Sequence, residues 1–298
     1  MKKDNKISKE NAKVDKEENN RKKKYLIKKH KVDFFVKILL RFMVFLSASV
    51  IFIIFIFVVF KGVKVFLPGY EYGRYSLKDF LTGTVWRQDR AEYGALFIII
   101  NTLISSLGAA VIAFPLAILT ALFIVKVAPK RLKETLKTVI NLLAAIPSVV
   151  YGVFASAVIV SLVDSFARAL GFSTFGGNSL LAVILLLGIM ILPTITAVSI
   201  TAIESVDKDL ELGSFALGAT KMQTNFKIVL MSAKSGLFAG LILGLGRAFG
   251  EATAVSMVAG NKFYGPTLNP FDITRTLTST MLAGLKETSG IDYDIRFS

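Results

Sequence analysis

Five long apolar runs constrain this chain more than any other feature of its sequence. Four of them carry no charged residue: 42–60, 96–125, 138–163 and 179–203. The fifth begins at Gly236 and includes two charged side chains. About 20 apolar residues in a helix cross the roughly 30 Å hydrocarbon core of a bilayer, and a helix satisfies its own backbone hydrogen bonds there. We therefore predict an all-α polytopic membrane protein with five visible spans.

Much of the positive charge lies before the first span. Residues 1–33 hold 13 Lys and Arg against six Asp and Glu, a composition typical of disorder. Such a basic run can bind nucleic acid, but lysines that flank a hydrophobic span more simply mark the cytoplasmic side. We predict a disordered cytoplasmic tail at residues 1–33 and a retained first transmembrane helix within residues 34–66, rather than a cleaved signal peptide.

Charged and turn-forming residues locate the connections between the spans. Residues 67–93 are predicted to be an extracytoplasmic loop with short helices. The basic connection at residues 126–137 and the polar one at residues 204–227 are both predicted to be cytoplasmic. A loop around Asp164 then lies on the far side, and residues 262–298 lie outside.

Three prolines, Pro115, Pro147 and Pro193, interrupt the apolar runs. A proline removes one backbone donor from a helix. Each one marks either a kink that helps helices to pack or a discontinuity beside a solute cavity. The hydroxyl side chains that follow two of them, Ser148 and Thr194, are therefore candidates for contact with a solute.

Arg247 and Glu251 lie inside the fifth apolar run. A charged residue in a membrane helix costs about 2.5–3.5 kcal/mol and normally faces a bundle interior or a substrate path. At about 100° per residue, both share one helix face with Gly236, Gly240 and Gly244, a row that permits close helix packing on a helix that the sequence does not identify. Two interpretations stay open: an i,i+4 ion pair that locks helices together, or a site on a solute path.

The sequence lacks the groups that several enzyme classes and metal sites require. It has no cysteine, and its one histidine, His30, lies among the lysines of the tail, which excludes thiol chemistry and paired-histidine metal sites. It has no phosphate-binding loop motif. We predict that the chain is not an enzyme and binds no metal or cofactor. The alternative is an intramembrane enzyme with Glu251 as its base, recognisable by activity of the chain alone.

The polar connection reads ELGSFALGAT from Glu211, with IVLM from Ile228. It resembles the EAA loop of ABC importer permeases, a short helix that docks on an ATPase subunit. The Glu lies one place early, and Met231 replaces the closing proline of the family pattern. An ordinary amphipathic connection is the alternative. The resemblance assigns ATPase coupling to Glu211, Gly218, Ala219, Thr220 and Ile228.

Three further segments carry a more specific resemblance. They are Trp86 with the later Tyr-Gly and Asn-Thr-Leu, AIPSVVYG from Ala145, and LGLGRAFGE from Leu243 followed by MVAGN. Over about residues 35–290 the chain resembles the C-type permease subunits of phosphate-specific (Pst) ABC transporters, which have the type I importer fold.

The Pst resemblance implies that residues 94–298 form the transmembrane domain of an ATP-driven importer of inorganic phosphate in a prokaryotic plasma membrane. Arg247 and Glu251 match a charged pair that the family associates with translocation. The expected partners are a companion A-type permease, a dimeric ATPase that uses ATP and Mg, and an extracytoplasmic phosphate-binding protein. Membrane lipid surrounds the chain, and no nucleic acid is expected.

The chain departs from this family pattern in its number of spans. The family has six spans and this sequence shows five, so either it is truncated or the last helix is dispensable. A truncated chain could be a non-transporting scaffold, which would co-purify with the ATPase without uptake. A separate alternative is a permease for sulfate or molybdate, which would be recognised by uptake competition.

Overall fold

A computed structural model describes the backbone of residues 2–285 and 287–298 and the side chains of residues 33–285 and 287–298. The chain divides into two compact units, residues 1–61 and 62–298, which are described separately. In the described part, five helices are long and apolar enough to cross a membrane. The predicted helical architecture with five spans is therefore confirmed.

The first unit consists of most of helix α1 (Lys2–Lys64). The apolar section of this helix, Asp33–Lys64, is the first candidate span and overlaps the helix predicted within residues 34–66. We predicted disorder for residues 1–33, whereas helix α1 begins at Lys2 and its backbone includes the rest of this segment. The side chains of residues 1–32 lie outside the described part, and the disordered tail stays a prediction.

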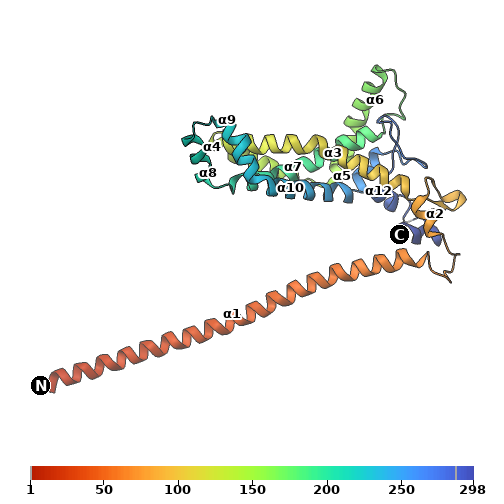
Figure 1. The fold of residues 1–298 in the computed structure, drawn as a ribbon. Helices are drawn as coiled ribbons and strands as arrows, with labels where there is room; N and C mark the ends of the chain where they lie inside the picture. The colour runs from red at the N-terminus through yellow and green to blue at the C-terminus, as the bar shows by residue number, and fades with distance from the viewer. Residues whose placement is uncertain (1, 286) are drawn as a thin grey trace. The chain divides into compact units, whose positions relative to one another are not determined.

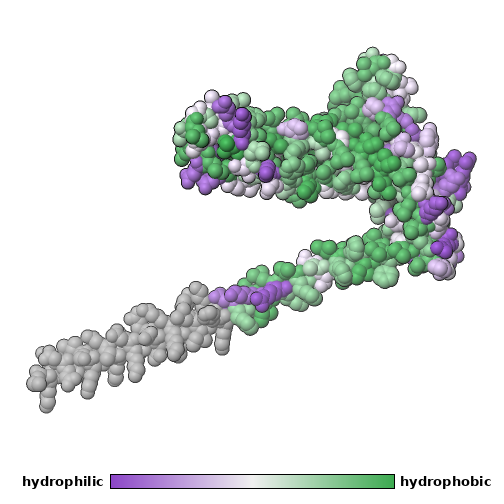
Figure 2. All heavy atoms as spheres, viewed as in Figure 1, coloured by the Kyte–Doolittle hydropathy of each residue, from purple (hydrophilic) through white to green (hydrophobic). Residues whose placement is uncertain are grey.

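The second unit is a helical bundle built around α7 (Leu180–Glu204). Helices α3 (Leu96–Leu122) and α10 (Leu230–Gly250) pack along α7 (Figure 1). In the most apolar window of α7, 56% of the residues are buried, more than in α3 or α10, so α7 forms the centre of the core. Figure 2 shows apolar side chains along the sides of this bundle and hydrophilic ones gathered toward its two ends.

The glycine row on α10 faces α7. A Cβ atom added to Gly236 would lie 2.5 Å from the Cβ of Ala202, and one added to Gly244 would lie 2.6 Å from Ile195 Cγ1. One added to Gly240 would lie 3.4 Å from the carbonyl oxygen of Ile195. The three glycines therefore let the two backbones approach closely, and the helix that packs on the row is α7 of the same chain.

The third apolar run differs from the single interrupted span predicted at residues 138–163. It divides at Pro147, where Ile146 and the proline itself have extended backbone conformations, because a proline disfavours helical geometry in the residue before it. The first part is α4 (Lys130–Ala145). The second part is a continuous helix made of α5 (Ser148–Phe154), a π-helical turn η3 (Ala155–Ile159) and α6 (Val160–Ala169).

Asp164 lies within α6 rather than in the loop predicted around it. It forms an ion pair with Arg168 at 2.8 Å, one helical turn later. This i,i+4 pairing compensates two charges at the end of the helix. The candidate span consequently extends over Ser148–Ala169.

The two connections predicted to be cytoplasmic are largely helical. Asp207 and Thr220 each accept a hydrogen bond from a backbone amide of the following turn, so these polar residues start helices as N-caps. The last helix of the second connection runs on into α10, so one span extends over Lys221–Gly250. Beside α4, the elements of these connections are the π-helical turn η2 (Phe123–Val127), α8 (Lys208–Ala216), α9 (Lys221–Gln223) and the π-helical turn η4 (Thr224–Val229).

Residues 67–93 contain a β-hairpin that the sequence did not indicate, in addition to the short helix α2 (Leu77–Thr82). Trp86 pairs with Tyr93 across the hairpin, and a bridge between Val85 and Tyr264 ties it to the segment after α11. The hairpin consists of β1 (Trp86–Arg87), η1 (Gln88–Arg90) and β2 (Glu92–Tyr93). The last elements are α11 (Thr253–Val258), α12 (Leu277–Leu282), α13 (Ile291–Asp294) and η5 (Ile295–Phe297).

Replacing Gly236 with Ala is expected to destabilise the chain by about 1–3 kcal/mol, because the new Cβ overpacks the contact with Ala202. Gly246→Ala is the matched control in the same helix, where nothing lies within 4 Å of an added Cβ. Helix propensity should leave that variant neutral or stabilise it by up to about 1 kcal/mol. Thermal unfolding of both purified variants in one detergent measures the difference, and equal stabilities would contradict the close packing of α10 on α7.

Candidate functional site

Arg247 lies in the last turn of α10, where this helix meets α7 and α4. Its Nη1 donates a hydrogen bond to Thr194 Oγ1 on α7 at 3.0 Å. The same nitrogen donates to the carbonyl oxygen of Ala144 on α4 at 3.4 Å. The Arg247 and Thr194 side chains are half-buried. The structure therefore brings together two of the residues that the sequence singled out from different apolar runs.

The end of α4 supplies a partner for Arg247 that the sequence did not reveal. Helix α4 ends at Ala145, and the last four carbonyls of a helix have no partner within it. These carbonyls carry a partial negative charge that favours a nearby cation. The Arg247 guanidinium therefore meets the partial negative charge of a helix terminus and a hydroxyl, and neither of these carries a full charge that would neutralise it.

Glu251 does not continue the helix face of Arg247, because α10 ends at Gly250 and Glu251 has extended backbone (φ −77°, ψ 113°). Its Oε1 accepts a hydrogen bond of 3.0 Å from the Ala254 amide at the start of α11. Its own carbonyl accepts one of 2.7 Å from Thr278 Oγ1. Among the ion pairs of the described residues, none joins Arg247 to Glu251. The i,i+4 pair considered for an unbroken helix does not form, and the carboxylate accepts a hydrogen bond from the first turn of the next helix instead.

Helix α5 follows the break after α4, helix α11 follows the break after α10, and these two helices pack together. A Cβ added to Gly152 on α5 would lie 2.9 Å from Ala254 Cα on α11, so the two backbones are in close contact. Ser148, another predicted site residue, is the first residue of α5 and is half-buried. The Tyr151 hydroxyl donates to the Leu143 carbonyl at 2.8 Å, which joins α5 to the end of α4 across the break.

The arrangement around Arg247 suits the binding of an oxyanion. A guanidinium carries five N–H donors, and in the described part only Nη1 of Arg247 has hydrogen-bond partners. The remaining donors are available to a ligand, and Thr194 adds a hydroxyl. The described residues contain no group of three His, Cys, Asp or Glu side chains that could hold a metal ion.

The residues predicted for coupling lie in α8, in η4 and around α9. Gly218 follows α8 with φ of +81°, a left-handed conformation that glycine adopts more readily than other residues. The Ala219 amide closes this turn by donating back to α8, and Thr220 caps α9. Glu211 and Ile228 are half-buried, whereas Gly218 and Thr220 are exposed.

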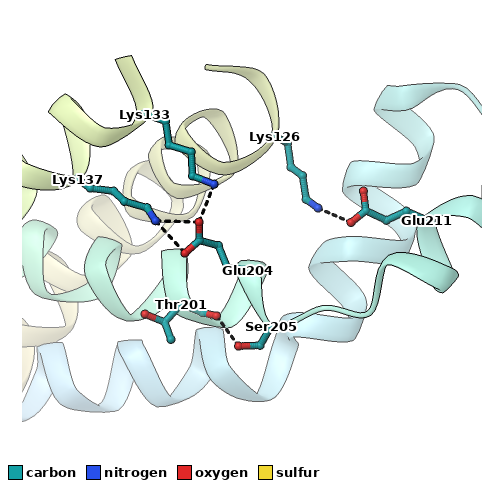
Figure 3. Close-up of polar contacts among 7 residues, drawn as sticks. All are labelled: Lys126, Lys133, Lys137, Thr201, Glu204, Ser205 and Glu211. Atoms are coloured by element: carbon teal, nitrogen blue, oxygen red, sulfur yellow. Dashed lines mark hydrogen bonds and ion pairs between the residues drawn. The ribbon is translucent and has the colours of Figure 1, made fainter. Parts of the chain in front are cut away.

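Two groups of ion pairs fix this end of the bundle (Figure 3). Lys126 of η2 pairs with Glu211 of α8. Lys133 and Lys137 of α4 both pair with Glu204 at the end of α7, at 2.6 and 2.8 Å. Sequence reasoning singled out Glu211 but missed its cation and the Glu204 group. The spacing of four residues between Lys133 and Lys137, which puts both on one helix face, was the available signal.

Apolar side chains are exposed around these charges. Leu217 is 90% exposed, although leucine is among the residue types that are most often buried. Large apolar residues that stay exposed in such number indicate an interaction site. We call these exposed residues of α8, α9, η4 and the turn between α8 and α9 the α8–α9 surface, and they are Leu210, Leu212, Phe215, Leu217, Met222 and Phe226.

The sequence is similar to known membrane transport proteins. Residues 113–285 match the family model described as binding-protein-dependent transport system inner membrane component. The probable ABC transporter permease protein YqgH of Bacillus subtilis is 39% identical, over 83% of this chain and 77% of that protein. The phosphate transport system permease protein PstC of Pasteurella multocida is 32% identical, over 84% and 82%. The probable phosphate transport system permease protein PstC of Methanocaldococcus jannaschii is 33% identical, over 73% and 74%.

Glu251→Ala is expected to lower the free energy of unfolding by about 1 kcal/mol, because it removes the acceptor of the Ala254 amide. Glu251→Gln keeps a side-chain oxygen in the same place and is expected to retain most of that stability. Thermal unfolding of the two purified variants beside the parent chain measures both effects. If the two substitutions cost the same, the hydrogen bond from the Ala254 amide to the Glu251 side chain does not contribute to stability.

Proposed function

The chain belongs to the family of binding-protein-dependent transport system inner membrane components, and from this premise we propose that Arg247 forms part of its solute path. The chain is a multi-pass membrane protein with the ABC importer permease fold. It is a permease subunit of an ATP-driven importer of inorganic phosphate, as its similarity to several phosphate transport system permease proteins indicates.

The observation that carries the proposed solute path is the pair of neutral acceptors around Arg247. A charge at membrane depth is costly unless it is compensated, and a permanent carboxylate partner would be the simplest compensation. Arg247 has instead a hydroxyl and a backbone carbonyl. These two acceptors orient the guanidinium without neutralising it, so its positive charge is available to an anion. Arginine stays charged at neutral pH and its planar fork fits phosphate oxygens.

Glu251, Thr194 and Ser148 complete the proposed path. Glu251 lies just beyond the end of α10 and is not neutralised by Arg247, so its negative charge would repel a second anion and weaken the hold on the first. A solute that is bound too tightly cannot leave a conduction path. Thr194 already accepts a hydrogen bond from Arg247, and Ser148 stands at the start of α5; both hydroxyls can donate to an oxyanion.

The α8–α9 surface is proposed to dock on a separate ATPase subunit dimer, which would bind ATP and Mg. All of its exposed apolar residues except Leu210 lie within the segment that resembles the EAA loop, from Glu211 to Ile228. The helix that begins at this surface, Lys221–Gly250, also carries Arg247 in its last turn. A displacement of α9 by the ATPase would therefore be transmitted along one rigid element to the proposed solute path.

The orientation in the plasma membrane is proposed from the charge distribution. Lys126, Lys133 and Lys137 lie beside the α8–α9 surface, and an excess of such residues marks the cytoplasmic side. The same rule places the lysine-rich N-terminus in the cytoplasm. The β-hairpin then faces outward, toward an extracytoplasmic phosphate-binding protein, and a companion A-type permease forms the other half of the path.

Arg247→Ala is expected to leave membrane insertion intact and to reduce phosphate uptake by about 10–100-fold, equivalent to about 1.4–2.7 kcal/mol. Uptake is measured in proteoliposomes that hold the variant with its companion permease and ATPase, after assembly has been confirmed. Arg168→Ala is the matched control, because the Arg168 side chain is 72% exposed and pairs with Asp164 on its own helix. Normal uptake by an assembled Arg247→Ala complex would exclude the residue from the path.

Gly218→Ala is expected to reduce phosphate-dependent ATP turnover of the assembled complex several-fold, because the left-handed backbone at this position costs other residues about 1–2 kcal/mol. The strain would displace the turn between α8 and α9. Gly213→Ala within α8 is the control, since this glycine has neither a positive φ nor an atom within 4 Å of an added Cβ. ATP turnover that is equal in the two variants would argue against docking through this turn.

A further inference from the structure

Two arginines outside the candidate membrane spans share a pocket that contains no acidic side chain. Arg275 precedes α12 and Arg296 lies in η5, and each is only 6% exposed. The pocket has a volume of about 180 Å³, well above the roughly 10–15 Å³ that one water molecule requires. Its lining residues are Trp86, Gln88, Phe263, Arg275, Ala283, Gly284 and Arg296.

Arg275 lacks any polar partner within the described part of the chain. Its Nε is buried without a hydrogen bond, and its guanidinium lies over the ring of Phe263, 5.4 Å from the ring centroid. Burial, together with the nearby Arg296, lowers the pKa of Arg275 to about 10, so the side chain is still charged at neutral pH. Stacking on an aromatic ring fixes the plane of a guanidinium but does not replace its lost hydration.

Arg296 is held in place by neutral groups. Its Nε donates to the Asp292 carbonyl at 2.9 Å, and its Nη1 donates to the Thr280 carbonyl. Its Nη2 lies beside Gly284, 3.4 Å from the position of an added Cβ. The Asp292 carboxylate attracts Arg296, but burial outweighs that attraction and lowers the pKa of Arg296. No ion pair of the described residues includes either arginine of the pocket.

Two buried guanidinium groups side by side are unfavourable without an anion. Arg275 has no carboxylate partner, and Asp292 compensates Arg296 only in part. Burying an unpaired charge is costly, and the second positive charge adds repulsion. A dianionic tetrahedral ligand would offset both charges and accept hydrogen bonds from both guanidinium forks. Gln88 also lines the pocket, and a glutamine side-chain amide has two N–H donors.

We propose that the pocket between the β-hairpin and η5 is a second oxyanion site that binds inorganic phosphate through Arg275 and Arg296. It is separate from Arg247, which lies in the last turn of α10 among the membrane helices. Free phosphate and the phosphate group of a lipid share the chemistry that this pocket recognises. The restricted volume favours the free ion.

Trp86 allows the proposal to be tested without any transport assay. It is the only tryptophan in the sequence and lines the pocket, so its fluorescence reports occupancy. The full chain is placed in phosphatidylcholine nanodiscs and titrated with sodium phosphate at constant ionic strength, with sodium chloride as reference. A saturable change in Trp86 emission is expected for phosphate and not for chloride.

Four variants show which arginines the change in Trp86 emission depends on. Arg275→Met and Arg296→Met are each expected to raise the apparent Kd for phosphate at least tenfold. Arg168→Met removes the same charge from an exposed position and should keep the parent Kd. Arg247→Met should also keep it, which separates the pocket from the site in the bundle. A thermal unfolding curve for each variant shows whether it is folded, and phosphate should raise the Tm of the parent more than that of Arg296→Met.

Three results would overturn the proposal. The first is a Trp86 signal that does not saturate with phosphate. The second is a Kd in folded Arg275→Met and Arg296→Met that equals the Kd of Arg168→Met. The third is a response to phosphatidylglycerol in the nanodisc without any response to free phosphate, which would assign the pocket to a lipid headgroup. None of these results depends on uptake, so they leave the proposed role of Arg247 to its own test.

Discussion

A helix that ends among other membrane helices must find hydrogen-bond partners within the protein, because lipid supplies none. Two helices of the bundle end in this way, α4 at Ala145 and α10 at Gly250. Arg247 donates to a carbonyl at the first end, and the Glu251 carboxylate accepts from the first turn of α11 just beyond the second. The two charges in the fifth apolar run thus belong to two different helix termini. This division leaves the guanidinium without a carboxylate and makes it suitable for an anion.

The position of Arg247 depends on the packing of α10 against α7. Gly236 and Gly244 bring the two backbones so close that a single methyl group would clash at either position. The same face, one turn beyond Gly244, brings Arg247 to Thr194. The glycines therefore set the distance between the two helices, and at that distance Arg247 reaches Thr194. At the other end of α7, Glu204 joins it to α4 through two lysines.

Hydropathy was sufficient to predict the five spans, because each is a long run of apolar residues. It was not sufficient to predict where helices break. Helix α10 ends at Gly250, and the Glu251 side chain accepts a hydrogen bond from the next helix, whereas a helical wheel assumes an unbroken helix. The Ala144 carbonyl could not be found in the sequence at all, since every residue has one. The β-hairpin was missed because its strands have two residues each and depend on a bridge to Tyr264.

Each of three candidate spans contains a single π-helical turn: η2 after α3, η3 between α5 and α6, and η4 before α10. Such a turn holds one residue more than an α-helical turn. Deleting one residue from η3 would restore regular α-helical geometry and keep the residues of α6 on their present face, because the widened turn holds the extra residue. Val163 and Ala167, now buried, would stay against the core. Deleting one residue from the regular part of α5 would instead rotate α6 by about 100°. A one-residue gap in an alignment therefore has different consequences inside and outside a π-helical turn.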